Sequence, residues 1–287
     1  MPKVLLSLFL AAALAASIAA DSHSVLHTER SSPGDLEVGG ELAGLPPGST
    51  RYVRYEDLLK LPQETYTVND DSNFPPGTVV SGVALTTLAR LFGESPESTL
   101  IVAVCYDRYR TNYPLDYLVE HRPLLVLRIN GKPRDGWPRS PKGGPLGPYL
   151  ISHPFFEPAY KVLSHEDEPQ IPFGVMRIEF RRESVVFGAI HPRGDWPANS
   201  RVEQGFRIAR QDCFRCHNMG AEGGQMAGKS WLDLSAVAQA DSARFKQIIR
   251  DPASVTATAK MQGEPGYDDA TLDALTAYFR TFSSRHP

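Results

Sequence analysis

Along the first two thirds of the chain, apolar residues form short runs separated by turn residues, a pattern that predicts β structure. The run Thr99–Val104 predicts one buried strand. Leu124–Ile129 predicts a second strand, which ends at the turn dipeptide Asn130-Gly131. Residues 173–180 alternate between two faces and predict a third strand. Short helices are expected only at 55–61 and 84–92.

Beyond residue 200, the apolar residues recur at the spacing of helices. Val202–Ala209 begins the first helical pattern, and Phe245–Ile249 belongs to a second helix that must end before Pro252. A last helix over Leu272–Phe282 has an apolar stripe and is capped by Asp268 or Asp269. The change of period predicts a β-rich α+β domain followed by an all-α domain.

Between these two patterns, residues 183–200 are punctuated by proline and glycine, which is typical of a linker. The sequence therefore predicts one domain over residues 36–182, a linker over 183–200 and a second domain over 201–287. No internal repeat is visible.

The N-terminus has the order of charges and apolar residues that is typical of a secretory signal peptide. Lys3 precedes the apolar run Val4–Leu14, and mostly small residues follow up to Ala20. The alternative is an uncleaved membrane anchor, for which the stretch is short and is interrupted by serines. We expect residues 1–20 to be removed, so that the mature protein does not span a membrane and is exported.

Composition narrows the classes of function. The chain has 287 residues, a net charge of −3 and 41% hydrophobic residues, which is typical of globular domains. Because no basic stripe is present, a nucleic-acid partner is not expected. The chain has only three cysteines, too few for a disulfide framework, so we interpret them as groups with a chemical role.

Two of these cysteines lie in Cys213-Phe-Arg-Cys216-His217, which has the C-x-x-C-H spacing of covalent haem attachment. Two thiols three positions apart at the end of a helix can reach the two vinyl groups on one porphyrin edge. The next residue, His217, is then held under the iron and offers an axial nitrogen. The alternatives are a zinc site, which would need a second pair of ligands, and a thioredoxin-like redox pair, which would not need His217.

The second axial ligand is expected to be a methionine from a distant segment. Met261 is favoured because it lies in an irregular segment just before the last helix, where a loop can cover the far face of the ring. Met226, in a glycine-rich loop, and an iron without a second protein ligand remain alternatives. Met261 could also be a residue that fills a gap in the core.

With these motifs in place, residues 201–283 resemble a class I cytochrome c domain. Gly205-Phe206, Lys260-Met261 and Leu275–Phe279 match that family in addition to the haem motif. The resemblance implies a single low-spin haem c with His217 and Met261 as axial ligands to the iron. It also implies one-electron transfer to a redox partner protein, and export makes the periplasm the expected location.

The front part of the chain resembles the molybdopterin-binding domain of sulfite-oxidase-like oxidoreductases over residues 36–182. The resemblance rests on short sequence motifs that occur in the same order as in the family. These motifs are Gly82–Leu88, Cys105–Tyr109, Ile129–Pro133, Gly144–Leu146 and Phe173–Phe180. Asp107-Arg108-Tyr109 departs from the D-G-Y signature of that family, which puts in doubt the contact that the glycine would make.

If molybdenum is bound, the resemblance implies that the Cys105 thiolate is its ligand and that Arg108, Arg110 and Lys142 hold the pterin phosphate. A lone cysteine after an apolar strand is otherwise a small buried apolar residue.

Two functions follow from the sequence. In the favoured one, the front domain is a docking module without a cofactor, and the chain is an exported monohaem electron carrier. In the alternative, a molybdenum-dependent oxidoreductase similar to sulfite dehydrogenases oxidises a small-molecule substrate and passes the electrons to its own haem.

Overall fold

The computed structural model describes residues 25–93, 99–141 and 143–282, so the expected signal peptide at 1–20 and Lys142 lie outside the described residues. The chain forms two compact units. Unit 1 comprises the residues up to Cys105 together with Tyr113–Phe155 and Ile171–Arg182. Unit 2 comprises Tyr106–Asn112, Phe156–Gln170 and the residues from Glu183 onward. Two segments that precede residue 182 thus belong to the second unit, although the sequence pattern assigns them to the first domain.

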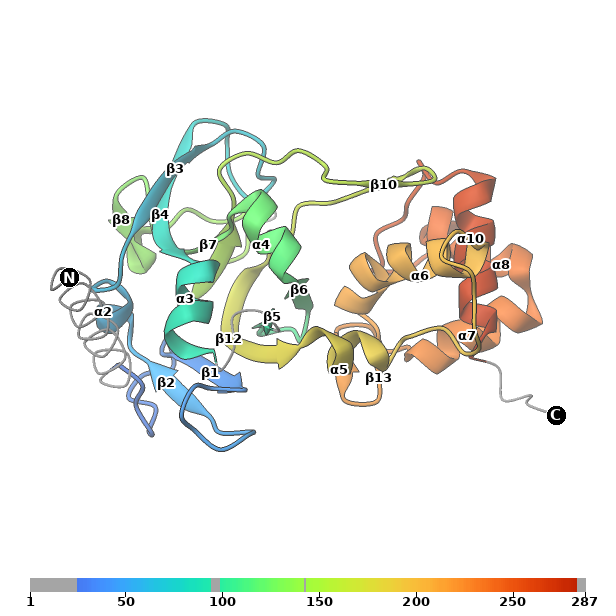
Figure 1. Ribbon diagram of the computed structural model, residues 1–287. Coiled ribbons are helices and arrows are strands. Elements are labelled where there is room, and N and C mark those ends of the chain that lie inside the picture. The colour runs from blue at the N-terminus through green and yellow to red at the C-terminus, as the bar shows by residue number, and fades with distance from the viewer. Residues whose placement is uncertain (1–24, 94–98, 142, 283–287) are drawn as a thin grey trace, which may run out of the picture. The chain divides into compact units, whose positions relative to one another are not determined.

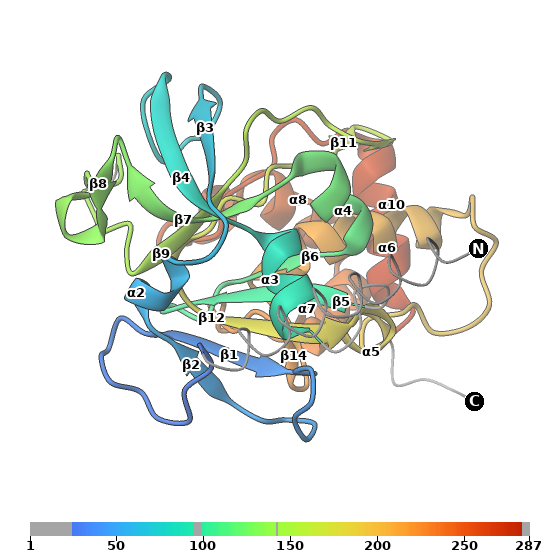
Figure 2. The ribbon, with the colours of Figure 1, turned by 60° about the vertical axis from the view of Figure 1, so that its left-hand side comes forward.

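Unit 1 is built on a twisted, mostly antiparallel sheet (Figures 1 and 2). Its main path runs β2-β1-β12-β9-β7-β4-β3, with β5 paired to β12 and β8 paired to β7. Of these strand pairs, β1–β12 is parallel and the others are antiparallel. The strands are β1 (Leu36–Gly40), β2 (Arg51–Val53), β3 (Glu64–Val68), β4 (Thr78–Ala84), β5 (Thr99–Cys105), β7 (Leu124–Ile129), β8 (Lys132–Pro133), β9 (Tyr149–Ser152) and β12 (Phe173–Arg182).

The three predicted strands are confirmed as β5, β7 and β12. β7 ends at Asn130 and Gly131, which both have positive φ, as a tight hairpin turn requires. The two predicted helices are confirmed in shorter form as α2 (Tyr55–Leu58) and α3 (Leu85–Phe92). A further helix, α4 (Leu115–His121), packs on α3, and the 3₁₀ turn η1 (Arg134–Gly136) follows β8.

The buried core of unit 1 encloses the carboxylate of Asp71. Asp71 is 4% exposed, accepts a hydrogen bond from the Ser152 hydroxyl at 2.7 Å and accepts another from the Asn73 amide at 2.8 Å. Burial raises the pKa of Asp71 to about 6, because the charged form loses its hydration.

We predict that Asp71→Asn removes a pH-dependent loss of stability. The carboxyl ionises at lower pH in the unfolded chain than in the folded one, so wild-type stability falls as the pH rises through the interval between the two pKa values. The variant should gain at most about 3 kcal/mol relative to wild type between about pH 4 and about pH 7. Denaturant unfolding at both pH values measures the difference, with the exposed Asp135→Asn as control. An advantage that is the same at both pH values would contradict the prediction.

Unit 2 is mainly helical. Its helices are α5 (Glu183–Gly188), α6 (Arg201–Gln211), α7 (Trp231–Ala240), α8 (Ser242–Arg250), α9 (Pro252–Val255) and α10 (Asp269–Arg280), and the 3₁₀ turn η2 (Cys213–Arg215) follows α6. It also contains two small hairpins, β10 (Lys161–Val162) with β11 (His165–Glu166) and β13 (Asn218–Met219) with β14 (Glu222–Gly223). The strand β6 (Arg110–Tyr113) continues from unit 2 into unit 1. The prediction of an all-α domain over 201–287 missed the β13–β14 hairpin, because two-residue strands leave no periodic pattern.

Two helices of unit 2, α6 and α10, lie against each other (Figure 1) and pack closely at Gly205. A Cβ on Gly205 would lie 2.1 Å from the carbonyl oxygen of Ala274 and 2.7 Å from Cβ of Tyr278. The adjoining core is aromatic, with Trp231 packed 4.8 Å from Phe279 between ring centroids. The close backbone approach explains why residue 205 is a glycine in the middle of a helix, where glycine is otherwise unfavourable.

The stretch 183–200, for which the sequence predicts a linker, is part of unit 2 and begins with α5. The Tyr278 hydroxyl donates a hydrogen bond to the carbonyl of buried Ile190. The Arg193 amide donates another to the Thr281 hydroxyl. Proline and glycine form turns in this stretch, and these turns are held by their contacts with the core of unit 2.

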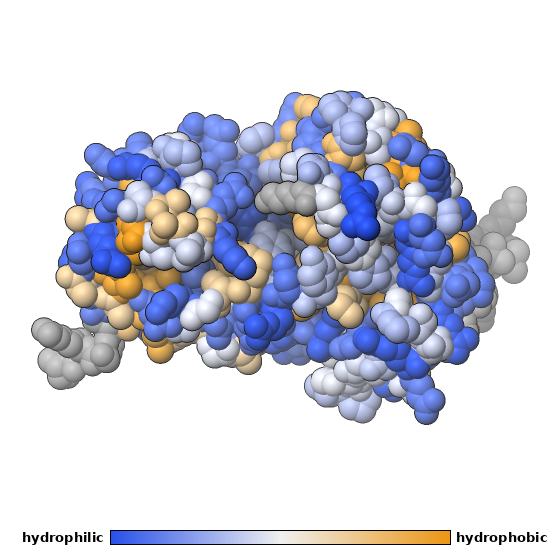
Figure 3. Space-filling view, turned by 180° about the vertical axis from the view of Figure 1, so that it is seen from behind, coloured by the Kyte–Doolittle hydropathy of each residue, from blue (hydrophilic) through white to orange (hydrophobic). Residues whose placement is uncertain are grey.

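Hydrophilic side chains cover most of the face shown in Figure 3, and hydrophobic ones occur as small separate patches. Within the described part of the chain, no helix combines the length and the apolar character needed to cross a bilayer.

We predict that Gly205→Ala destabilises unit 2 by about 3 kcal/mol, because the added methyl group forces the two helices apart. Thermal or chemical unfolding of the full chain measures the loss. Gly188→Ala is the control, since a Cβ at that position meets no atom within 4 Å. Equal stability of the two variants would contradict the proposed role of Gly205.

Candidate functional site

The C-x-x-C-H motif forms one tight turn at the end of α6. The amides of Cys216 and His217 both donate to the carbonyl of Cys213, at 3.2 and 3.0 Å. η2 therefore keeps the two half-buried cysteines and the buried His217 next to one another. Neither cysteine is in a disulfide.

The ring of His217 is oriented by a backbone carbonyl. Its Nδ1 lies 2.7 Å from the carbonyl oxygen of Lys229, and because a carbonyl only accepts, Nδ1 carries the proton. Burial lowers the pKa of His217, which favours the neutral ring. In a neutral ring with the proton on Nδ1, the lone pair is on Nε2, and this is the form in which histidine binds a metal.

The glycine-rich loop 220–229 braces the same turn. The Gly224 amide donates to the carbonyl of Phe214 at 2.9 Å, and the Ala227 amide donates to the carbonyl of Cys216 at 3.0 Å. A Cβ on Gly224 would lie 1.8 Å from the carbonyl oxygen of Arg215, so only glycine fits there. These hydrogen bonds were not predicted from the sequence. The sequence pattern that points to this loop is the capping box of Ser230 and Asp233, which begins α7 directly after Lys229.

The surroundings of the Cys213 and Cys216 thiols do not suit a redox-active cysteine pair or a zinc site. Burial raises the pKa of Cys213 and of Cys216, whereas a redox-active pair requires a lowered pKa on the attacking thiol. A zinc site requires further ligands, and within the described residues neither cysteine belongs to a group of three potential metal ligands.

The two candidate methionines lie in different surroundings. Met226 is 45% exposed and lines an open pocket of about 490 Å³ with Lys229 and Asp233, on the loop that braces His217. Met261 is 41% exposed and lies in the loop between α9 and α10. That loop leads to Tyr267, whose hydroxyl donates to the carboxylate of Asp212, the residue before Cys213.

Acidic residues gather beside the cysteine turn. Glu168 and Asp212 accept hydrogen bonds from the Arg215 guanidinium, each at 2.8 Å. Burial raises the pKa of Glu264 to about 7, and the nearby carboxylates of Glu168 and Asp212 add to this increase.

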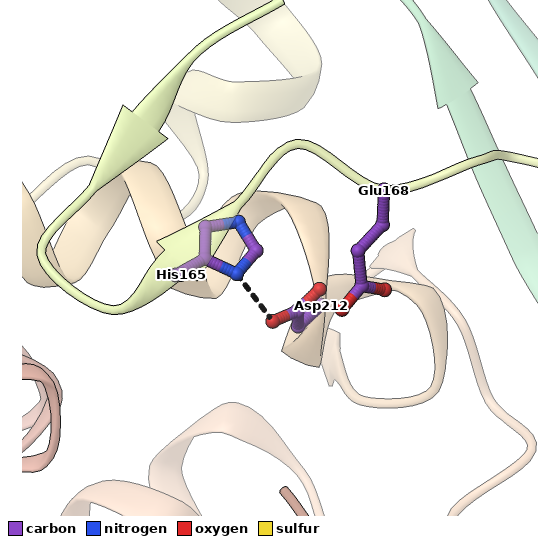
Figure 4. Close-up of side chains that lie close together, drawn as sticks. All are labelled: His165, Glu168 and Asp212. Carbon is purple, nitrogen blue, oxygen red and sulfur yellow. Dashed lines mark ion pairs between the residues drawn. The ribbon is translucent and has the colours of Figure 1, made fainter. Parts of the chain in front are cut away.

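His165, Glu168 and Asp212 lie close enough together to resemble a metal site (Figure 4). Their ligand atoms are within 4.8 Å of one another. Both carboxylates, however, already bind the cation of Arg215, and both ring nitrogens of His165 have hydrogen-bond partners. The geometry therefore describes an ion-pair network that is complete without a metal.

The residues assigned to molybdopterin do not form an accessible ligand set. Cys105, at the end of β5, is 5% exposed. The guanidinium of Arg110 lies 3.3 and 3.4 Å from the carbonyls of Ala221 and Gly223, which it binds within unit 2. Lys142 lies outside the described residues. Arg108 is exposed and lines the open pocket that also contains Met226. A buried thiol and a guanidinium that binds backbone carbonyls do not fit a molybdenum ligand and a donor to a pterin phosphate.

A comparison with solved structures finds the sulfane dehydrogenase SoxCD from Paracoccus pantotrophus at a TM-score of 0.34 and 16% sequence identity. The match covers 54% of this chain and 40% of that chain, so the chain spans less than half the length of the structure that it matches. No protein-family model matches the chain, and the search of curated proteins finds no match. At this score and identity, the likeness establishes no family membership.

Proposed function

We propose that this protein is an exported c-type cytochrome that carries single electrons on one covalent haem. Cys213 and Cys216 would form the two thioethers, and His217 and Met261 would be the axial ligands. The observation that carries the proposal is the hydrogen bond from Nδ1 of His217 to the Lys229 carbonyl, within a motif that offers two reduced thiols. When bound, the haem would supply a ferric–ferrous couple.

In this proposal, the chain's own residues fix the site before the haem is attached. The brace at Gly224 and Ala227 holds the carbonyls of the cysteine turn, and the Lys229 carbonyl fixes both the tautomer and the tilt of His217. A rigid ligand changes little in geometry when the iron changes its charge, which keeps the cost of each electron transfer low.

Met261 is preferred to Met226 because of the loops on which they lie. Met226 belongs to the loop that holds His217, so it is expected on the same face of the ring as the histidine. Met261 belongs to a separate loop whose end is bonded to Asp212. A sulfur ligand favours the ferrous state and raises the reduction potential.

We propose that unit 1 serves as a docking module without a cofactor, and that a redox partner protein binds the chain in the periplasm. The burial of Cys105 and the contacts of Arg110 support this reading. The molybdenum-dependent oxidation of a small molecule is the alternative. The resemblance of residues 36–182 and the position of Cys105 at the end of β5 favour it.

Expression with export and haem maturation should yield protein whose mass is increased by one haem and which stains for peroxidase activity after denaturing electrophoresis. Cys213→Ala together with Cys216→Ala should abolish the covalent haem, because no thioether remains. Cys105→Ala is the matched control and should retain it. Bare wild-type polypeptide after correct maturation would overturn the proposed function.

Met261→Ala should lose the far-red sulfur-to-iron charge-transfer band of the ferric protein and should lower its reduction potential, because the soft ligand is gone. Met226→Ala, an equally exposed methionine, should leave both properties unchanged. If the two variants exchange these results, Met226 is the ligand.

Metal analysis of the matured protein decides between the two roles of unit 1. We expect iron in the amount of the haem and no molybdenum. One molybdenum per haem that disappears in Cys105→Ser would establish the alternative instead.

A further inference from the structure

The hairpin segment Phe156–Gln170, here called the strap, precedes the end of the first domain in sequence but belongs to unit 2. Its strands β10 and β11 are joined by Leu163, which has a φ of 58°, and by Ser164. Its side chains form hydrogen bonds with three parts of unit 2, namely the end of α6, the cysteine turn and the start of α10.

His165 is the centre of the strap and is 1% exposed. Its Nε2 lies 2.7 Å from the amide oxygen of Gln211, and its Nδ1 lies 2.8 Å from the hydroxyl of Tyr267. Nδ1 also lies 3.4 Å from the carboxylate of Asp212, the pair drawn in Figure 4. One side chain therefore joins the last residues before Cys213 to the segment that follows Met261.

The donors and acceptors assign the protons of this network. Gln211 uses its amide nitrogen to donate to the carboxylate of Asp167, so its oxygen must accept from Nε2 of His165. Tyr267 uses its only proton to donate to Asp212, so its oxygen must accept from Nδ1. His165 thus binds both segments at once, through Nε2 to Gln211 and through Nδ1 to Tyr267.

The neighbours of His165 strengthen the same connection. The Ser164 amide donates to the Thr271 hydroxyl at 3.0 Å, and the Asp268 amide donates to the Ser164 hydroxyl at 3.0 Å, which ties the strap to the N-terminus of α10. Glu168 accepts from Arg215, which lies between the two cysteines. The strap is bonded to the flanks of both segments that carry the proposed haem ligands.

We propose that His165 is a positioning residue that holds the Met261 loop at a fixed place relative to the Cys213–His217 turn and so keeps the Met261 sulfur on the iron. This inference rests on the proposed haem function and deepens it. In this inference, His165, which precedes the helical part of the chain, controls the binding of the second axial ligand. It thereby also controls the reduction potential.

The test uses the matured full chain. His165→Gln removes the imidazole ring, and Tyr267→Phe removes only the hydroxyl that His165 contacts. Each variant should retain covalent haem but lower the ratio of methionine-bound to methionine-free ferric haem by about tenfold, which equals about 1.4 kcal/mol. The far-red charge-transfer band measures this ratio, and the reduction potential should fall with it.

Glu166→Gln is the matched control, because Glu166 neighbours His165 on the same hairpin and pairs only with exposed Lys161 among the described residues. It should leave the band and the potential unchanged. Tyr267→Phe preserves the ring and its packing, so it reports on the connection even where His165→Gln reduces the yield of folded protein.

The outcomes separate the two proposals. Wild-type protein that matures without covalent haem overturns the proposed function and this inference with it. Wild-type protein with haem and a methionine band, together with His165→Gln and Tyr267→Phe variants that match Glu166→Gln in band and potential, overturns the inference alone.

Discussion

The site depends on one hydrogen bond, from Nδ1 of His217 to the carbonyl of Lys229. This bond selects the tautomer that has its lone pair on Nε2, and burial lowers the pKa of the ring so that the lone pair stays free of a proton. The loop that supplies the carbonyl is itself held to the cysteine turn by two hydrogen bonds that its backbone amides donate. His217 and the loop that orients it are therefore held together by local hydrogen bonds.

A second constraint acts at a longer range in the sequence. The strap, from Phe156 to Gln170, and the short segment Tyr106–Asn112 belong to unit 2 although strands of unit 1 surround them in sequence. The strap joins α6 to the segment before α10 through His165, and Arg110 binds the carbonyls of the glycine-rich loop. The helical unit is thus completed by residues that precede position 183, and a division of the chain at residue 200 would remove these contacts.

The same contacts change how the front unit is interpreted. Arg110 has a cationic group that suits a phosphate, but the structure uses it as a donor to two backbone carbonyls. Cys105 ends a strand, as a metal ligand would, but it lies in the core. A residue in a motif can bind a ligand only when its polar atoms are accessible and have no other hydrogen-bond partner. The Cys105 thiol is buried, and the Arg110 guanidinium already binds backbone carbonyls.

The sequence by itself determined the features that depend on neighbours in the chain. The C-x-x-C-H turn, the strand Leu124–Ile129 with its Asn130-Gly131 turn, and the helices around Val202 and Leu275 each follow from local spacing. Only the tertiary structure decided that Lys229 orients His217, that Gly205 meets Ala274, and that His165 joins Gln211 to Tyr267. Partners that are 12 to 102 residues apart leave no periodic pattern, because the fold alone brings them together.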